Sequence, residues 1–140
     1  MKFSSLFSFA FLGTILTACS STSSFKQSDL KPEIYQGYWA MQPVNDQYRV
    51  VKFETGGAVK IYDYTCDFQD HSYRLNETET VYLSRIKENT FNLLDSKKKA
   101  FAKFEILQLN AQKMQAKQSF DKERPLILNY TRLQGAKPLC

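Results

Sequence analysis

The sequence predicts an all-β domain built as an antiparallel up-and-down meander of about eight strands. From about residue 34 onward, apolar and polar side chains alternate with a period of two in a series of short runs. Short turns containing glycine, asparagine or aspartate separate most of these runs, as in β-hairpins. Helical spacing of apolar residues is scarce. A meander hides its edge strands completely by closing into a barrel, and a two-sheet β-sandwich is the alternative.

The first half of the domain contains three of the expected strands. They cover Tyr35–Met41, Gln47–Phe53 and Ala58–Cys66. The turn Glu54–Gly57 joins the second strand to the third, and its glycines can adopt positive φ. The polar stretch from Asp67 to about Thr78 is expected to form a longer connection.

The second half alternates in the same way and contains five more expected strands. Lys87–Asn89 and Asp95–Lys98 have the composition of hairpin turns. Pro125 begins the last run, where its missing N–H is tolerated. The five strands are Thr80–Ile86, Thr90–Leu94, Ala100–Leu107, Gln112–Gln118 and Pro125–Leu133.

The N-terminal residues 1–18 have the pattern of a signal peptide. The apolar run Phe3–Leu16 follows Lys2 and is shorter than the roughly 20 residues of a transmembrane helix. Leu16-Thr17-Ala18-Cys19 resembles the lipobox of bacterial lipoprotein precursors. The resemblance implies cleavage before Cys19, a diacylglycerol on its thiol and an acylated amino terminus. Ser20 follows, where lipoproteins retained in the inner membrane typically carry Asp, so the resemblance favours the outer membrane with the domain facing the periplasm.

The composition after the signal peptide predicts a tether and one folded domain. Residues 19–33 are expected to form a lipidated flexible tether, because Ser20 to about Lys31 is rich in Ser and Thr. The domain is expected to cover residues 34–140. Loss of Lys2 with the signal peptide lowers the net charge from +5 to +4. An exported protein rarely meets nucleic acid, so anionic lipid is the more available partner, and solubility alone is the simpler explanation of this charge.

With Cys19 assigned to the lipid, Cys66 and Cys140 remain as a pair. An exported chain passes through an oxidising compartment, where such a pair is expected to form a disulfide. A free thiol is the alternative. In the chain-entropy description, a loop of this length stabilises the fold by roughly 4–5 kcal/mol, and the bond would also fix the end of the chain.

Two motifs give the domain a resemblance to the lipocalin and calycin families. Gly37-Tyr38-Trp39 lies on the first expected strand, and Arg132 lies near the end of the last, in LNYTRL. The resemblance, which extends over residues 35–133, implies a small lipocalin-like barrel closed at one end by Arg132 packed on Trp39, a cation–π pair. The chain is shorter than a typical lipocalin, so a barrel filled by its own side chains is the alternative to a hollow one.

The expected function is non-enzymatic binding of a small apolar ligand or an envelope component. Phe53, Tyr62 and Phe104 are expected to point inward with Trp39 and line the ligand site. The alternative is a protein-binding module, either a hydrolase inhibitor or an accessory subunit of an envelope complex. The partners expected are therefore the membrane, through the lipid on Cys19, and either a small ligand or an envelope protein.

The sequence favours neither catalysis nor a metal or other cofactor. His71 is the only histidine, and Asp67 and Asp70 beside it do not complete a ligand set. Glu77 and Glu79 share a strand face, as a glycosidase carboxylate pair does, but a solvated end of a strand explains them better. We therefore expect no catalytic residue and no metal site.

Overall fold

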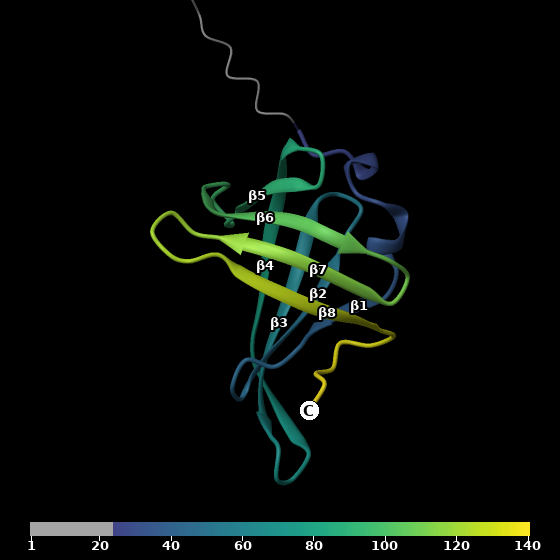
Figure 1. Cartoon of the computed structure of the whole chain (residues 1–140), viewed down its shortest axis with the longest axis vertical. Helices are drawn as coiled ribbons and strands as arrows, with labels where there is room; N and C mark the ends of the chain where they lie inside the picture. Colours follow the sequence, from purple (N-terminus) through teal and green to yellow (C-terminus); the bar gives the residue numbers. More distant parts are fainter. Residues whose placement is uncertain (1–23) are drawn as a thin grey trace, which may run out of the picture.

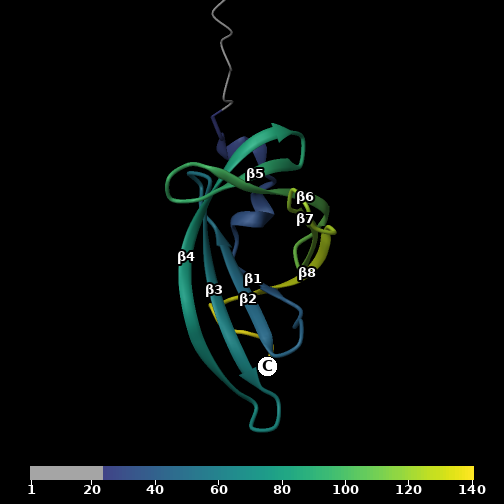
Figure 2. The same cartoon turned by 90° about the vertical axis from the view of Figure 1, so that its left-hand side faces the viewer.

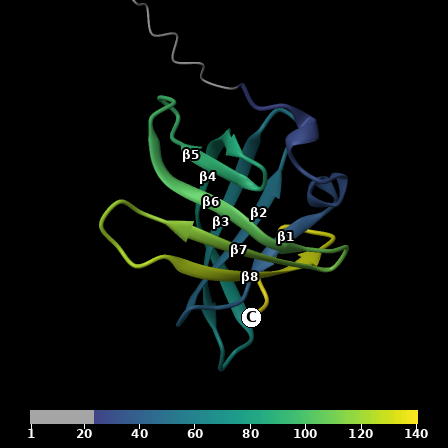
Figure 3. The ribbon, with the colours of Figure 1, turned by 45° about the horizontal axis from the view of Figure 1, so that its top comes forward.

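The chain folds into one closed barrel of eight antiparallel strands. The computed structural model describes residues 24–140, so the signal peptide and the lipidation expected at Cys19 lie outside the described residues. Each strand pairs with the next along the chain, and β8 pairs back onto β1 (Figures 1 and 3). The prediction of an all-β up-and-down barrel is confirmed, and the sandwich alternative is wrong. No helix in the described part of the chain has the length and hydrophobicity needed to cross a bilayer.

Two short 3₁₀ turns precede the barrel. They are η1 (Gln27–Asp29) and η2 (Pro32–Tyr35). The strands are β1 (Tyr38–Met41), β2 (Gln47–Phe53), β3 (Ala58–Asp67), β4 (Ser72–Lys87), β5 (Thr90–Leu94), β6 (Ala100–Leu109), β7 (Lys113–Ser119) and β8 (Leu126–Leu133).

The polar stretch after Cys66 is strand, which corrects the long connection expected there. Only four residues, 68–71, separate β3 from β4. The first half of β4 pairs with β3 alone, because β5 pairs only with residues 82–87. This part of the β3–β4 hairpin projects beyond the barrel (Figures 1 and 2). Its residues are exposed on both faces, so the alternation that marks a half-buried strand is absent.

Residues 25–36 close one end of the barrel, so the folded part begins earlier than the expected tether boundary at residue 33. Ile34 is fully buried and Leu30 nearly so, both within the main core. Phe25 packs on Phe91, with ring centroids 6.3 Å apart. The indole Nε1 of Trp39 donates a hydrogen bond of 2.8 Å to the Ile34 carbonyl. Burial of these apolar side chains stabilises a segment whose Ser- and Thr-rich composition indicates a flexible tether.

Polar contacts hold this N-terminal plug, residues 25–36, to the barrel wall. The Arg85 guanidinium on β4 donates to the Asp29 carboxylate at 3.0 Å. The Lys52 ammonium on β2 donates to the carbonyls of Tyr35 and Gly37 at 2.9 and 3.0 Å. Gly37 has φ +71°, and a Cβ there would lie 2.5 Å from the Leu133 carbonyl oxygen, so only glycine fits where the plug enters β1.

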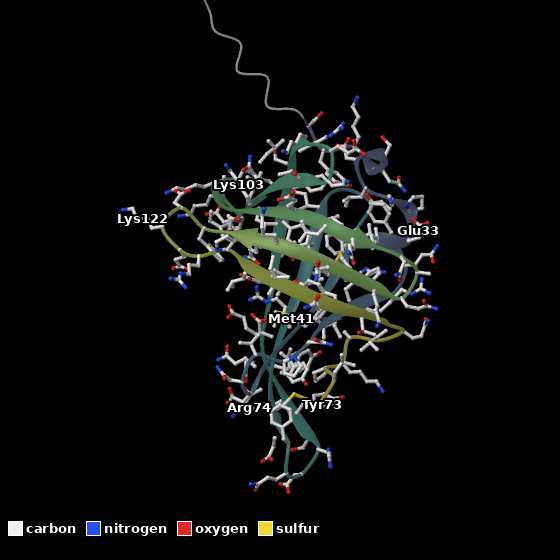
Figure 4. The ribbon with its side chains drawn as sticks, in the orientation of Figure 1. Glu33, Met41, Tyr73, Arg74, Lys103 and Lys122 are labelled. Atoms are coloured by element: carbon white, nitrogen blue, oxygen red, sulfur yellow. A yellow bond between two sulfur atoms is a disulfide. The ribbon has the colours of Figure 1, made fainter. Side chains whose placement is uncertain are left out.

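The C-terminal tail covers a second apolar cluster on the outer face of β1–β3. The cluster contains Ala40, Tyr48, Val50, Tyr64 and Cys66. The hydroxyls of Tyr48 and Tyr64 donate to the carbonyls of Leu139 and Ala136, and the disulfide Cys66–Cys140 fixes the last residue. Figure 4 shows this bond beside Tyr73, and the predicted disulfide is confirmed.

Candidate ligand-binding cavity

The two ends of the barrel differ in how they are closed. The start of β1 and the end of β8 meet at the end that the plug fills, because Tyr38 pairs with Leu133. The opposite end is formed by the end of β1 and the starts of β2 and β8, among others. The plug, Trp39 and Phe91 fill the interior near the closed end. Any open interior space therefore lies toward the opposite end.

A small apolar cavity remains inside the barrel. Its volume is about 50 Å³, whereas one water needs roughly 10–15 Å³ on this measure, so it holds a short alkyl or similarly small group. Phe53 on β2 and Phe104 on β6 both line it, with ring centroids 6.2 Å apart. Its other apolar lining residues include Val51, Val59, Ile61 and Val81.

A wider depression of about 550 Å³ lies at the open end and shares Arg49 and Gln118 with the inner cavity. We call this depression the mouth. The β1–β2 loop, β3, β4 and the two ends of the β7–β8 loop supply its walls, and Figure 4 labels Met41 in its lining and Lys122 at the tip of that loop. Apolar groups in the walls include Met41, Phe120 and Leu126. The apolar cavity thus opens into the larger mouth, whose lining mixes polar and apolar groups.

An ion pair stands where the cavity meets the mouth. The Arg49 guanidinium donates two hydrogen bonds to the Asp63 carboxylate, of 2.7 and 2.8 Å. The two residues are register partners on β2 and β3 and are each about one third exposed. The hydrogen bond to Asp63 is the main reason that the pKa of Arg49 lies above its ordinary value, and Glu79 raises it further. Arg49 therefore remains charged and held in place.

Two buried polar side chains line the cavity without a protein partner. Tyr130 on β8 is 4 % exposed and Gln118 on β7 is 8 % exposed. Within residues 24–140, neither the Tyr130 hydroxyl nor the Gln118 side-chain amide makes a hydrogen bond to protein. Burial raises the pKa of Tyr130, so its hydroxyl stays protonated at neutral pH. None of the described side chains has a fully buried nitrogen or oxygen atom without a partner, so the polar atoms of Tyr130 and Gln118 open into the cavity, where a water or a ligand group can bind them.

The structure places two of the three expected lining aromatics in the cavity. Phe53 and Phe104 line it as predicted. Tyr62 instead lies on the outer face, where its ring packs against Tyr38 at 6.2 Å. In β3 the inward residues are Val59 and Ile61, so Tyr62 must point outward, and the C-terminal tail makes that outer face apolar as well.

Trp39 and Arg132 are brought together across the β1–β8 seam as direct register partners. Trp39 is fully buried at the closed end. The Arg132 guanidinium, however, donates to the Gln36 side-chain oxygen at 2.9 Å. The cation–π contacts of the described residues are Lys52 over Tyr38 and Lys98 over Tyr82. Each of the two residues therefore binds the plug by its own hydrogen bond: the Trp39 indole donates to the Ile34 carbonyl, and the Arg132 guanidinium donates to the Gln36 side chain.

The remaining polar candidates separate into two places. His71 lies in the exposed β3–β4 turn with φ 50°. Glu77 and Glu79 are both exposed and share a face of β4 with Val81; they pair with Asp63 and Ile61 and line the mouth and the cavity respectively. No group of three or more potential metal ligands occurs among residues 24–140.

Sequence reasoning missed Arg49, Asp63, Gln118 and Tyr130 as site residues. Arg49 and Asp63 are charged residues on β2 and β3, and the hairpin between those strands sets them directly opposite each other. Two opposite charges at paired positions of the predicted hairpin could have indicated this ion pair from the sequence. No protein-family model matches the chain, and comparison with curated proteins finds no match either.

Proposed function

We propose that this protein is an exported, lipid-anchored binding protein that holds a small amphipathic molecule in the open end of its barrel. The apolar part of the ligand enters the cavity above Phe53 and Phe104, and its polar part stays in the mouth. Binding without chemical conversion is proposed because the only histidine, His71, lies in an exposed turn outside the cavity lining.

The observation that carries this proposal is the pair of unpartnered polar groups in an otherwise apolar chamber. The side chains of Tyr130 and Gln118 line the cavity, the two residues are each more than nine-tenths buried, and their polar atoms make no hydrogen bond to the described part of the protein. A residue that served packing alone would need no polar atom at a position that opens into an apolar cavity. Small-molecule sites combine apolar walls with a few oriented polar groups in this way.

The proposed location follows from the sequence of the N-terminus. The lipobox-like Leu16–Cys19 supports lipidation of Cys19, and Ser20 supports the outer membrane. Two or more acyl chains on one residue make a stable anchor, whereas one is marginal. Labelling of cells with an alkyne palmitate analogue tests this: the chain incorporates the label and fractionates with the outer membrane, and Cys19→Ala does neither.

Binding is tested by isothermal titration of the oxidised chain from Ser20 onward with octanol, whose chain end fits the cavity while the rest of the chain and the hydroxyl lie in the mouth. We expect one saturable site. Val81→Phe, which fills the cavity from β4, abolishes binding, whereas Ile127→Phe on the exposed outer face leaves it unchanged. Failure of octanol to bind, or equal binding to the Val81→Phe variant, would contradict the proposal.

A second candidate is a protein-binding role, which the projecting β3–β4 hairpin favours. Phe68, Tyr73 and Leu75 are each about half exposed there, although exposed apolar side chains are usually scattered singly (Figure 4). An envelope protein is the partner proposed. Tyr73→Ser with Leu75→Ser should then abolish site-specific crosslinking to that partner and leave octanol binding intact.

A further inference from the structure

The open end of the barrel carries a charge opposite to that of the whole chain. The chain has a net charge of +5, yet the cavity and mouth are lined by four carboxylates and one cation. The cation is Arg49, and its two hydrogen bonds to Asp63 neutralise that pair. The carboxylates left over are those of Asp46, Glu77 and Glu79, which give the site three uncompensated negative charges.

Charges near the mouth but outside its lining reduce this field only in part, since one cation, Arg74, donates a hydrogen bond to Asn76 in the mouth lining. The β7–β8 loop contains Asp121, Lys122, Glu123 and Arg124, whose charges sum to zero. The β5–β6 turn contains three lysines, residues 97–99, which do not line the cavity or the mouth. The Lys98 ammonium lies over the Tyr82 ring, and Tyr82 alternates with the inward Val81 and Leu83 and so faces outward. A cleft with low-dielectric walls concentrates the field of its own lining charges.

The unpartnered groups are suited to the same kind of ligand. The Tyr130 hydroxyl and the Gln118 side-chain oxygen can each accept a hydrogen bond, and an ammonium group offers three donors. Glu77 and Glu79 are two residues apart on one strand, so their side chains leave β4 on the same face. A cation at the junction of the cavity and the mouth, which Gln118 lines on both sides, has Glu79 and Tyr130 on its cavity side and Glu77 on its mouth side.

We propose that the ligand is a small apolar molecule with a cationic end, an amine or guanidine, recognised by Glu77 and Glu79 together with Tyr130 and Gln118. This inference rests on the proposed binding function and names its ligand class. The three negative charges of the cavity and mouth favour binding of a cationic group, and the apolar cavity favours an apolar substituent on that group.

The test compares three probes that share one alkyl chain: octylamine, octanol and octanoate, titrated calorimetrically at pH 7 into the oxidised chain from Ser20 onward. We expect octylamine to bind about tenfold more tightly than octanol at low salt and octanoate to bind more weakly than octanol, because only the charge differs. The advantage of the amine should shrink as ionic strength rises.

Substitutions locate the effect. Glu77→Gln with Glu79→Gln should abolish the tenfold preference for octylamine over octanol when both probes are measured on the same variant. Glu33→Gln with Glu88→Gln removes the same two charges at the plug end of the barrel and should leave the preference for the amine unchanged (Figure 4 labels Glu33).

The outcomes separate the two proposals. If octanol binds but octylamine binds no more tightly, or if the Glu77/Glu79 variant keeps the advantage of the amine, the cationic ligand class is wrong and the binding function stands. If none of the three probes binds, the binding function is wrong and this inference fails with it.

Discussion

Replacement of Ile34 by alanine tests whether the plug is an integral part of the fold. Ile34 is fully buried between the barrel core and the 3₁₀ turn that carries it. The substitution removes three carbon atoms, so the lost burial alone costs about 2.4 kcal/mol at roughly 0.8 kcal/mol per methylene. The cavity left behind raises the expected loss in unfolding free energy to about 3–4 kcal/mol.

Ile127→Ala is the matched control. Ile127 is 51 % exposed on β8, so the same truncation there should cost less than about 1 kcal/mol. The difference between the two variants, about 2 kcal/mol or more, isolates the contribution of burial in the plug.

Urea denaturation followed by two probes measures the effect. Trp39 is the single tryptophan, and its indole N–H bonds to the Ile34 carbonyl, so its fluorescence reports on the plug. Circular dichroism reports on the barrel strands. Coincident transitions mean that plug and barrel unfold together. If Ile34→Ala costs no more than Ile127→Ala, or if fluorescence changes well before the strands melt, residues 25–36 are an attached tether and the reasoning is refuted.

Three further predictions concern the turn, the tail and the cavity. Gly57→Ala should cost about 1–3 kcal/mol, because Gly57 has φ +83° and a Cβ would lie 2.6 Å from the Phe25 ring; Gly56→Ala, which meets nothing within 4 Å, is the control in the same urea assay. Reduction of Cys66–Cys140, which spans 74 residues, should lower the unfolding free energy by about 4–5 kcal/mol, and an unchanged urea midpoint would contradict the role given to the tail. Burial raises the pKa of Tyr130 above its ordinary value of 10.0, so the stability from its protonated form is complete below pH 10 and is lost as the pH rises toward the folded-state pKa. Tyr130→Phe should keep its stability at pH 7, since no hydrogen bond to protein is lost, and should lose less than the parent chain between pH 10 and 11; parallel curves would refute this.

The barrel could be predicted because apolar and polar residues alternate along its strands and because glycine, asparagine or aspartate marks most of its turns. The Glu54–Gly57 turn and the register it sets between β2 and β3 follow from glycine and a period of two. The first half of β4 could not be predicted in this way, because a hairpin that projects into solvent has no buried face to mark it.

The plug and the orientation of Tyr62 depended on contacts between distant parts of the chain. Phe25, Leu30 and Ile34 are irregularly spaced in a polar segment, and only the open barrel end gives them a surface to cover. Tyr62 alternates with Ile61 in a strand that is apolar on both faces, because residues 133–140 return to cover the outside. A local pattern cannot tell two buried faces apart.

The aromatic residues that line the cavity could be predicted from the sequence, whereas its polar residues could not. Phe53 and Phe104 are large apolar residues on inward positions, which periodicity identifies. Gln118 and Tyr130 are polar or amphipathic residues at the same kind of position, and their lack of a partner becomes visible only when all eight strands are in place.

The closed end of the barrel has a consequence for how the protein stands on a membrane. Ser24 enters the fold at the plug, and only residues 20–23 lie between it and Cys19, so a fully extended chain of five Cα-to-Cα steps spans at most about 18 Å between them. With a lipid on Cys19, the plug end is drawn toward the bilayer and the opening at the other end faces away from it. In that arrangement, a molecule bound in the barrel exchanges directly with the aqueous phase and does not have to pass through the lipid to which the protein is attached.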